Sequence, residues 1–233
     1  MPKPAASIQQ TLSSLASLSP GYAAPKAPLR IHFPSTTVTQ PGEHLTKAAS
    51  ASEPSFSVAA TALNNLSFPN RDLSPTTNAS SATDPPSPGT PELSTAAAPR
   101  YLIAGLDLDP PFPTFPVMGP ALHMLRADLA LATGEVNPDD EFIRLEDGEE
   151  GSVVGRRPVA YYLGPSPPPV GGPHRYVFML WEQPEGVTGE RIKEEMGYDE
   201  GGVGMMGRVR WDQEGFEKKL GLGKVVAGNY FVC

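Results

Sequence analysis

The stretch GGPHRYVFMLWEQP, residues 171–184, decides the fold of this chain. A Gly/Pro turn leads directly into a run in which apolar side chains occupy both sets of alternating positions from 176 to 181. A strand that is apolar on both faces is typical of the centre of a sheet. The turn in front of it presents His174 and Arg175 for polar contacts. The sequence therefore predicts a central strand at 175–181 with a polar site at its start.

A second strand end carries two acidic residues. The apolar run YLIAGL, residues 101–106, lies between Pro99 and the acidic and proline-rich sequence DLDPP, which predicts another buried central strand. Asp107 and Asp109 follow at alternate positions, so an extended chain places both side chains on one face. The prolines after them end the strand. We expect the two carboxylates to point into one cavity.

The segment ALHMLRADLALA, residues 121–132, places a second histidine, His123, among apolar residues. Leu122, Leu125 and Leu129 fit a helical stripe, and this periodicity alone favours a helix. Alternation would instead put His123, Leu125 and Leu129 on one face of a strand.

These three motifs resemble the phosphatidylethanolamine-binding protein (PEBP) family, whose signature pairs a D-x-D-x-P strand end with a later G-x-H-R-Y strand. The resemblance covers residues 29–40 weakly and 101–231 well. It implies a mainly β fold: a PEBP-like β-sandwich of a large central antiparallel sheet and a smaller sheet, with a few short peripheral helices. It also favours a strand at 121–132.

Composition supports one β-rich domain at 27–233, preceded by a tail or short helix at 1–26. The chain has 233 residues, of which 39% are hydrophobic, enough for a core, and its 28 prolines and 23 glycines disfavour a helical bundle. A Ser/Thr/Ala/Pro-rich stretch at about 48–99 holds too few apolar side chains to offset chain entropy, so we expect a long mobile insertion there. Asn65 and Asn78 begin glycosylation triplets that matter only in a secreted chain.

Other segments follow local patterns. We expect strands at 29–33, 158–162 and 225–232, and a short helix capped by Asp212, running through Leu220 and ended by Gly221. The acidic stretch 135–151 predicts a solvated loop, with a weaker alternative as a metal site. Residues 186–207 have no clear pattern.

The candidate site combines groups suited to an anion. Two imidazoles donate hydrogen bonds near neutral pH, a carboxylate can orient them, and Tyr176 shares a strand face with His174. The resemblance implies that Asp107, His123, His174 and Tyr176 line a small pocket for phosphate, acetate-like anions or a phosphorylated head group. The full set of ligand-binding candidates is Asp107, Asp109, His123, Tyr162, His174 and Tyr176.

Each candidate also has a structural explanation. An isolated histidine in an apolar strand is more often a satisfied core group than a ligand. Asp109 can serve backbone groups at the strand end, and Tyr162 can form a pocket wall or simply pack. Arg175 faces away from His174 and favours a salt bridge behind the site.

The chain departs from the family pattern around the pocket. Leu108 and Phe112 stand where the family commonly has proline and serine, and Ala121 and Leu122 replace an aromatic or histidine. The chain ends at Cys233, where animal members continue into a helix that closes the pocket. We therefore expect a more apolar and more open mouth.

Three functions remain open. The first is a binding or regulatory module that holds a small anion or lipid head group and has a possible protein partner. The second is an accessory cyclase of fungal maleidride-type secondary metabolism, assisting dimerisation of maleic anhydride monomers, with His123, His174 and Asp107 as catalytic residues. The third is a serine carboxypeptidase inhibitor. A hydrolase is disfavoured, because no Ser or Cys lies in a nucleophile elbow.

Charge and cysteine content limit the partners and the compartment. The net charge of −8, without a basic patch, disfavours nucleic acid. No apolar run is long enough to span a bilayer, and no metal or cofactor is assigned. The N-terminal region lacks a secretory signal and Cys233 is the lone cysteine, which favours a cytoplasmic protein.

Overall fold

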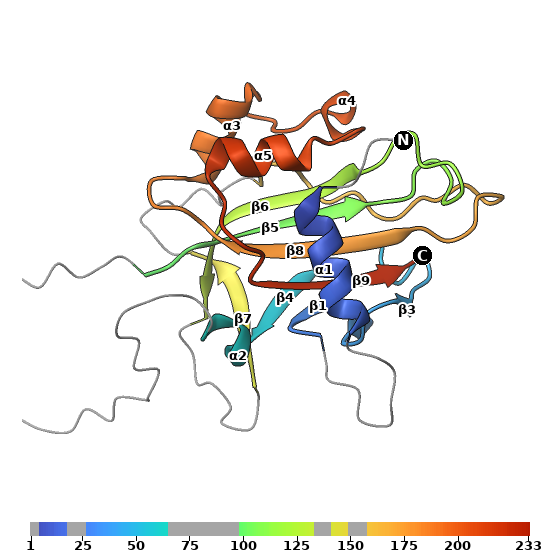
Figure 1. The fold of residues 1–233 in the computed structure, drawn as a ribbon, viewed down its shortest axis with the longest axis horizontal. Helices are drawn as coiled ribbons and strands as arrows, with labels where there is room; N and C mark the ends of the chain where they lie inside the picture. The colour runs from blue at the N-terminus through green and yellow to red at the C-terminus, as the bar shows by residue number, and fades with distance from the viewer. Residues whose placement is uncertain (1–4, 18–26, 65–97, 133–140, 149–157) are drawn as a thin grey trace, which may run out of the picture.

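The computed structural model describes residues 5–17, 27–64, 98–132, 141–148 and 158–233, and their strands form one nine-stranded sheet (Figure 1). The order across the sheet is β2-β1-β4-β7-β6-β5-β8-β9-β3. The strands are β1 (Leu29–Phe33), β2 (Thr36–Val38), β3 (Glu43–His44), β4 (Ser55–Ala59), β5 (Tyr101–Asp107), β6 (Ala121–Leu131), β7 (Phe142–Asp147), β8 (Arg175–Glu182) and β9 (Ala227–Val232). Neighbouring strands are antiparallel except β3 and β9, which are parallel, so the sheet is mixed.

The centre of the sheet is β5, which pairs with β6 on one side and β8 on the other. Every residue of β5 is buried, and β8 is buried from Tyr176 to Trp181. The two central strands predicted from apolar runs are therefore confirmed. The segment 121–132 is a strand, as the PEBP resemblance implied, because packing between β5 and β7 outweighs its helical periodicity.

The mainly β prediction is confirmed, but the described strands do not divide into a large and a small sheet. β7 bonds to β4 on one side and to β6 on the other, so the hydrogen-bonded order is continuous. The ends of the sheet curl toward each other: Asn229 Nδ2 in β9 donates to Leu29 O in β1 at 2.9 Å and to Val38 O in β2 at 3.3 Å. The sheet is therefore nearly closed, and its interior holds one apolar core.

That inner core joins strands that are distant in the sheet order. The ring of Phe178 in β8 lies 5.5 Å from Phe56 in β4 and 6.1 Å from Phe231 in β9, between ring centroids. Phe33 in β1 also meets Phe231 at 5.5 Å, edge to face. Burial of these rings therefore holds the curled sheet together.

A second core lies between the outer face of the central strands and the helices. The helices are α1 (Ala6–Ala16), α2 (Ala60–Leu63), α3 (Gly189–Met196), α4 (Met205–Arg208) and α5 (Gln213–Leu220). Figure 1 shows α3, α4 and α5 on one side of the sheet, where α3 and α4 contact β6, while α1 contacts β9. Trp181, Ile192 and Phe216 are among the buried side chains of this core.

The predicted C-terminal elements are confirmed. α5 begins after Asp212, whose side chain accepts a hydrogen bond from Gly215 N, and ends at Gly221 in the left-handed conformation. β9 lies within the strand expected at 225–232. The strand predicted at 29–33 corresponds to β1.

Several local predictions are corrected. Part of the acidic stretch 135–151 is β7 rather than loop, because Phe142 and Leu145 are buried. Residues 158–162 form only an isolated bridge, between Ala160 and Leu125. β4 and α2 lie inside the stretch 48–99 assigned to an insertion, so ordered chain extends to residue 64 there. Residues 65–97, including Asn65 and Asn78, lie outside the described residues.

None of the described helices is long and apolar enough to cross a membrane.

Candidate functional site

Three neighbouring strands bring the predicted polar residues to one end of the sheet. Asp107 is the last residue of β5, and its register partners are Tyr176 in β8 and Ala121 in β6. His123 lies two residues into β6, and His174 immediately precedes β8. Motifs that lie 67 residues apart in the chain thus meet in one hydrogen bond, between His174 and Asp107.

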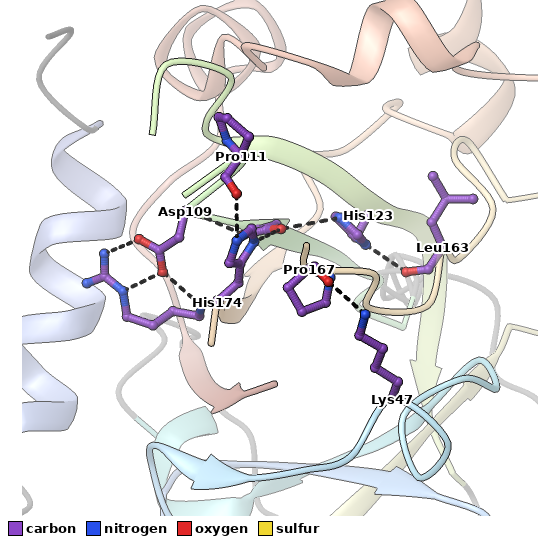
Figure 2. Close-up of polar contacts among 9 residues, drawn as sticks. Lys47, Asp109, Pro111, His123, Leu163, Pro167 and His174 are labelled. Carbon is purple, nitrogen blue, oxygen red and sulfur yellow. Dashed lines mark hydrogen bonds and ion pairs between the residues drawn. The ribbon is translucent and has the colours of Figure 1, made fainter. Parts of the chain in front are cut away.

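Asp107 is the centre of this cluster. Its Oδ2 atom lies 2.8 Å from His174 Nδ1 and 3.9 Å from His123 Nε2, while its Oδ1 atom accepts a hydrogen bond from Asp109 N at 2.9 Å. Figure 2 shows His174 next to the carbonyl group of Pro111 and His123 next to that of Leu163. The Asp107 carboxylate therefore orients the His174 ring, lies next to the His123 ring, and fixes the turn that ends β5.

Both ring nitrogens of His174 face acceptors. Nδ1 faces the Asp107 carboxylate, and Nε2 lies 3.2 Å from the carbonyl oxygen of Pro111. The backbone is also fixed, since His174 and Cys233 exchange hydrogen bonds of 2.7 and 3.0 Å. Both ring nitrogens therefore already have a protein partner. His174 is 1% exposed, so it is a buried support of the site.

His123 has one anchored nitrogen and one available nitrogen. Its Nδ1 donates to Leu163 O at 2.7 Å, and Leu163 N donates back to His123 O at 2.8 Å. Burial lowers the pKa of His123, and the charges of Arg208 and His174 lower it further, against the opposing effects of Leu163 and Asp107. The side chain is 15% exposed. His123 is therefore neutral at pH 7 and presents its Nε2 atom to the cluster.

Tyr176 contributes a buried hydroxyl group. Its ring stands edge-on to His123 at 5.2 Å and stacks on Phe231 at 5.2 Å. Its side chain is 2% exposed, and its hydroxyl group lies near the Asp107 carboxylate and the backbone of Ser166, which both affect its pKa, without a hydrogen bond of good geometry to either. Burial, followed by the charge of Asp107, raises the pKa of Tyr176, so the phenol stays protonated. It is a buried donor beside His123 that has no well-formed hydrogen bond among the described residues.

Two other candidates are engaged elsewhere. Asp109 accepts from Arg175 N, Nε and Nη2 at 2.8, 2.9 and 2.6 Å, which is the salt bridge expected behind the site. Its carboxylate is 1% exposed and faces Arg175 rather than the histidines. Tyr162 donates its hydroxyl group to Ser50 O at 2.7 Å and packs against Phe33. Both residues therefore have structural partners in the described chain.

Within the described residues the site is largely covered, where a more open mouth was expected. Asp107 is 4% exposed and His174 1%, because Pro111 O covers the second nitrogen of His174. A cavity of about 610 Å³ lies elsewhere, between α1, the 116–120 loop and the start of α5, and its lining includes Arg175 but neither histidine. The apolar residues that depart from the family pattern thus occur around a site whose polar groups are largely buried.

Sequence reasoning missed three groups of the site: the carbonyl oxygens of Pro111 and Leu163, and the side chain of Arg208. Backbone carbonyls leave no signal in a sequence, because every residue has one. Arg208 lies at the end of α4, directly after the unassigned segment 186–207. Its guanidinium donates to His123 O and Tyr161 O at 3.4 and 2.9 Å, a contact that only the fold creates.

A sequence model of the family described as phosphatidylethanolamine-binding protein matches residues 36–231. The chain belongs to the PEBP family. The resemblance drawn from the three motifs is therefore confirmed.

Two curated fungal relatives are similar to this PEBP. It is 32% identical over 136 residues to the carboxypeptidase Y inhibitor of Saccharomyces cerevisiae, covering 56% of this chain and 58% of that protein. It is 33% identical over 119 residues to phomoidride biosynthesis cluster protein N of Talaromyces stipitatus, covering 48% and 49%. The matches thus span about half the length of these relatives.

A solved structure supports the fold. The structure of carboxypeptidase Y inhibitor complexed with its cognate proteinase matches with a TM-score of 0.54 and 24% identity, covering 89% of this PEBP and 83% of that chain. This likeness concerns the fold.

The lowered pKa of His123 predicts a dependence of stability on pH. Since the folded protein holds this proton less tightly than the unfolded chain, the contribution of His123 is complete above pH 6.5 and declines as the pH falls toward the folded pKa. One such group changes stability by at most about 1.4 kcal/mol per pH unit. We expect the free energy of unfolding, measured with urea, to fall less between pH 7.5 and pH 5.5 for His123→Gln than for the wild type.

The matched control is His44→Gln, since His44 is exposed on β3. This variant should keep the pH dependence of the wild type. An equal acid loss in the wild type and His123→Gln would show that His123 titrates as in the unfolded chain.

Proposed function

We propose that this PEBP binds a small anion, a phosphate or carboxylate group, through His123 and Tyr176, and acts as a binding or regulatory module. The observation that carries this proposal is a pair of polar atoms without a well-formed hydrogen bond among the described residues, on rings 5.2 Å apart. They are the Tyr176 hydroxyl oxygen and His123 Nε2, which lies 3.9 Å from Asp107 Oδ2. An anion between them would accept a hydrogen bond from each. Asp107 and His174 would support the site without direct contact.

Proton uptake would accompany binding. In the free protein, His123 Nε2 is an acceptor, because the ring is neutral and its proton resides on Nδ1. A bound anion favours the protonated ring, which raises the pKa of His123 and converts Nε2 into a donor. Affinity should therefore increase as the pH falls through the range in which free His123 titrates.

Access would run past His123. Its side chain is 15% exposed, whereas Asp107 and His174 are nearly covered. The adjoining segment 163–173 contains Gly172, which has a φ of +78° and open space where a side chain would stand. We propose that this segment shifts when the anion reaches Tyr176.

A thermal-shift panel tests this function with phosphate, phosphoethanolamine, acetate and alkyl-substituted maleates at pH 5.5 and 7.5. Ligands that bind the native state raise its melting temperature. We expect stabilisation by at least one anion, larger at pH 5.5, in the wild type and in the control His44→Gln. Tyr176→Phe and His123→Gln should each lose most of it, because each removes one donor.

The panel also separates possible sources of the anion. A larger rise in melting temperature with phosphoethanolamine than with free phosphate would indicate a lipid head group. A rise with free phosphate alone would indicate a soluble ligand. A shift that persists unchanged in both His123→Gln and Tyr176→Phe would place the anion elsewhere. Absence of any shift would contradict the proposed function.

A second candidate is inhibition of a serine carboxypeptidase. It is supported by the 32% identity to the carboxypeptidase Y inhibitor, although the match covers 58% of that protein. Titration of carboxypeptidase Y with the full chain tests it directly. Stoichiometric loss of peptidase activity would support this candidate, and full activity at excess chain would exclude it for that enzyme.

A third candidate is assistance in cyclisation of maleic anhydride monomers. The similarity to a protein named for a phomoidride biosynthesis cluster favours it, and neutral His123 beside Asp107 could act as a general base. Preferential stabilisation by the maleates would support this candidate. A panel in which phosphate binds and maleates do not would exclude it.

A further inference from the structure

Arg208 is a buried cation next to the anion site. Arg208 is 6% exposed, and no carboxylate among the described residues forms an ion pair with it. Buried charges are usually paired, because transfer of a charge out of water is costly. Within the part of the chain that the structure describes, Arg208 instead donates to backbone carbonyl oxygens. No described carboxylate therefore neutralises its positive charge.

The hydrogen bonds of Arg208 connect the segments that hold His123. Nη1 lies 3.3 Å from Leu122 O and 3.4 Å from His123 O, both in β6, and 2.9 Å from Tyr161 O. Two residues further on, Leu163 binds the His123 ring through its carbonyl oxygen. Nε donates to Val203 O at 3.1 Å, which links this arrangement to the segment before α4. One guanidinium group thus ties the backbone of β6 at His123 to the neighbouring 161–163 segment.

Three further titratable groups lie around His123. Asp107 on β5 is the facing acid, His174 lies before β8, and Tyr176 on β8 is a neutral phenol. The charge of Arg208 acts on His123 in the sense opposite to that of Asp107. A bound anion would add a negative charge beside Asp107, and this repulsion needs compensation.

We infer that Arg208 is a positioning residue of the anion site: it ties the 161–163 segment to β6, and its charge lies behind His123 where it favours a bound anion. This inference rests on the proposed function. It assigns a role to a residue outside the three motifs, and it divides the site into a donor face, made by His123 and Tyr176, and a cationic support behind it.

The test uses the full chain with inorganic phosphate as the probe and three variants. Arg208→Met removes the charge and the hydrogen bonds. Arg208→Lys keeps the charge but loses the planar set of guanidinium donors. Arg210→Met is the control. Arg210 is exposed and donates to Val117 O. Phosphate affinity is measured from pH 5.5 to 7.5, and the His123 ring is titrated by NMR in the same samples.

For Arg208→Met we expect two changes. The pKa of His123 should rise toward its ordinary value, and the affinity of the acid form for phosphate should fall about tenfold, equivalent to roughly one pKa unit of interaction. Arg208→Lys should melt at a lower temperature yet bind phosphate within about threefold of the wild type, because the charge remains. Arg210→Met should match the wild type.

Two results would overturn the inference. One is a folded Arg208→Met variant with unchanged phosphate affinity and unchanged His123 titration. The other is a folded Arg208→Lys variant that loses affinity tenfold, since a positive charge retained at this position would then not favour the bound anion, and this test holds even where Arg208→Met does not fold. A wild type that binds no phosphate would overturn the proposed function, and the NMR titration would still decide whether Arg208 acts on His123.

Discussion

Replacement of Asp107 with alanine is expected to abolish anion-dependent stabilisation and to lower the free energy of unfolding by about 2–4 kcal/mol. The carboxylate accepts from His174 Nδ1 and from Asp109 N, and both donors are buried. Removal of a buried acceptor leaves each donor unsatisfied, at a cost of about 1–3 kcal/mol per group. The His174 ring would lose its orientation, and the anion site would be disrupted at the same time. Urea unfolding with and without phosphate measures both effects.

The control is Asp147→Ala. Asp147 lies at the end of β7, and its carboxylate is 64% exposed and paired with Arg126 on the surface. Surface ion pairs contribute little, so this variant should stay within about 1 kcal/mol of the wild type and keep its anion response. An Asp107→Ala protein that unfolds like this control would show that the Asp107 contacts do not stabilise the fold.

Replacement of Phe178 with alanine is expected to destabilise the protein by about 3–5 kcal/mol without changing the hydrogen bonds of Asp107. Phe178 is 1% exposed and lies between Phe56 of β4 and Phe231 of β9. Its loss would leave a cavity at the point where the two ends of the curled sheet meet. Urea unfolding gives the change directly, and a single cooperative transition is expected.

Phe115→Ala is the matched control, because that ring is 56% exposed. It should change stability by no more than about 0.5 kcal/mol. If Phe178→Ala gave a similarly small change, the inner core could not be the principal contact between the two ends of the sheet.

The central strands were predictable because their burial is recorded directly in the residue pattern. β5 and β8 are apolar on both faces, and no surface strand tolerates such a sequence. β7 was not predictable, because only Phe142 and Leu145 are buried in an otherwise acidic segment. β4 lies at the start of a low-complexity stretch, and its pairing with β1 and β7 is non-local. Continuity of the sheet through β7 therefore could not be seen in the sequence.

The site was predictable to the level of residue types and motifs. The end of an apolar run placed Asp107 at a strand end, alternation placed Tyr176 on the same strand face as His174, and the PEBP resemblance placed His123 with them. Which atoms remain available depends on partners that only the fold supplies: Asp109 is engaged by Arg175, and the second nitrogen of His174 by Pro111 O. The sequence could not distinguish a free donor from an engaged one.

The most direct measurement is a crystal structure of the chain grown with phosphate at pH 5.5. We predict phosphate oxygens within about 2.5–3.2 Å of both His123 Nε2 and the Tyr176 hydroxyl oxygen, with the hydrogen bond between Asp107 and His174 retained. A structure in which phosphate is absent from this site, or is held by residues other than His123 and Tyr176, would contradict the central claim.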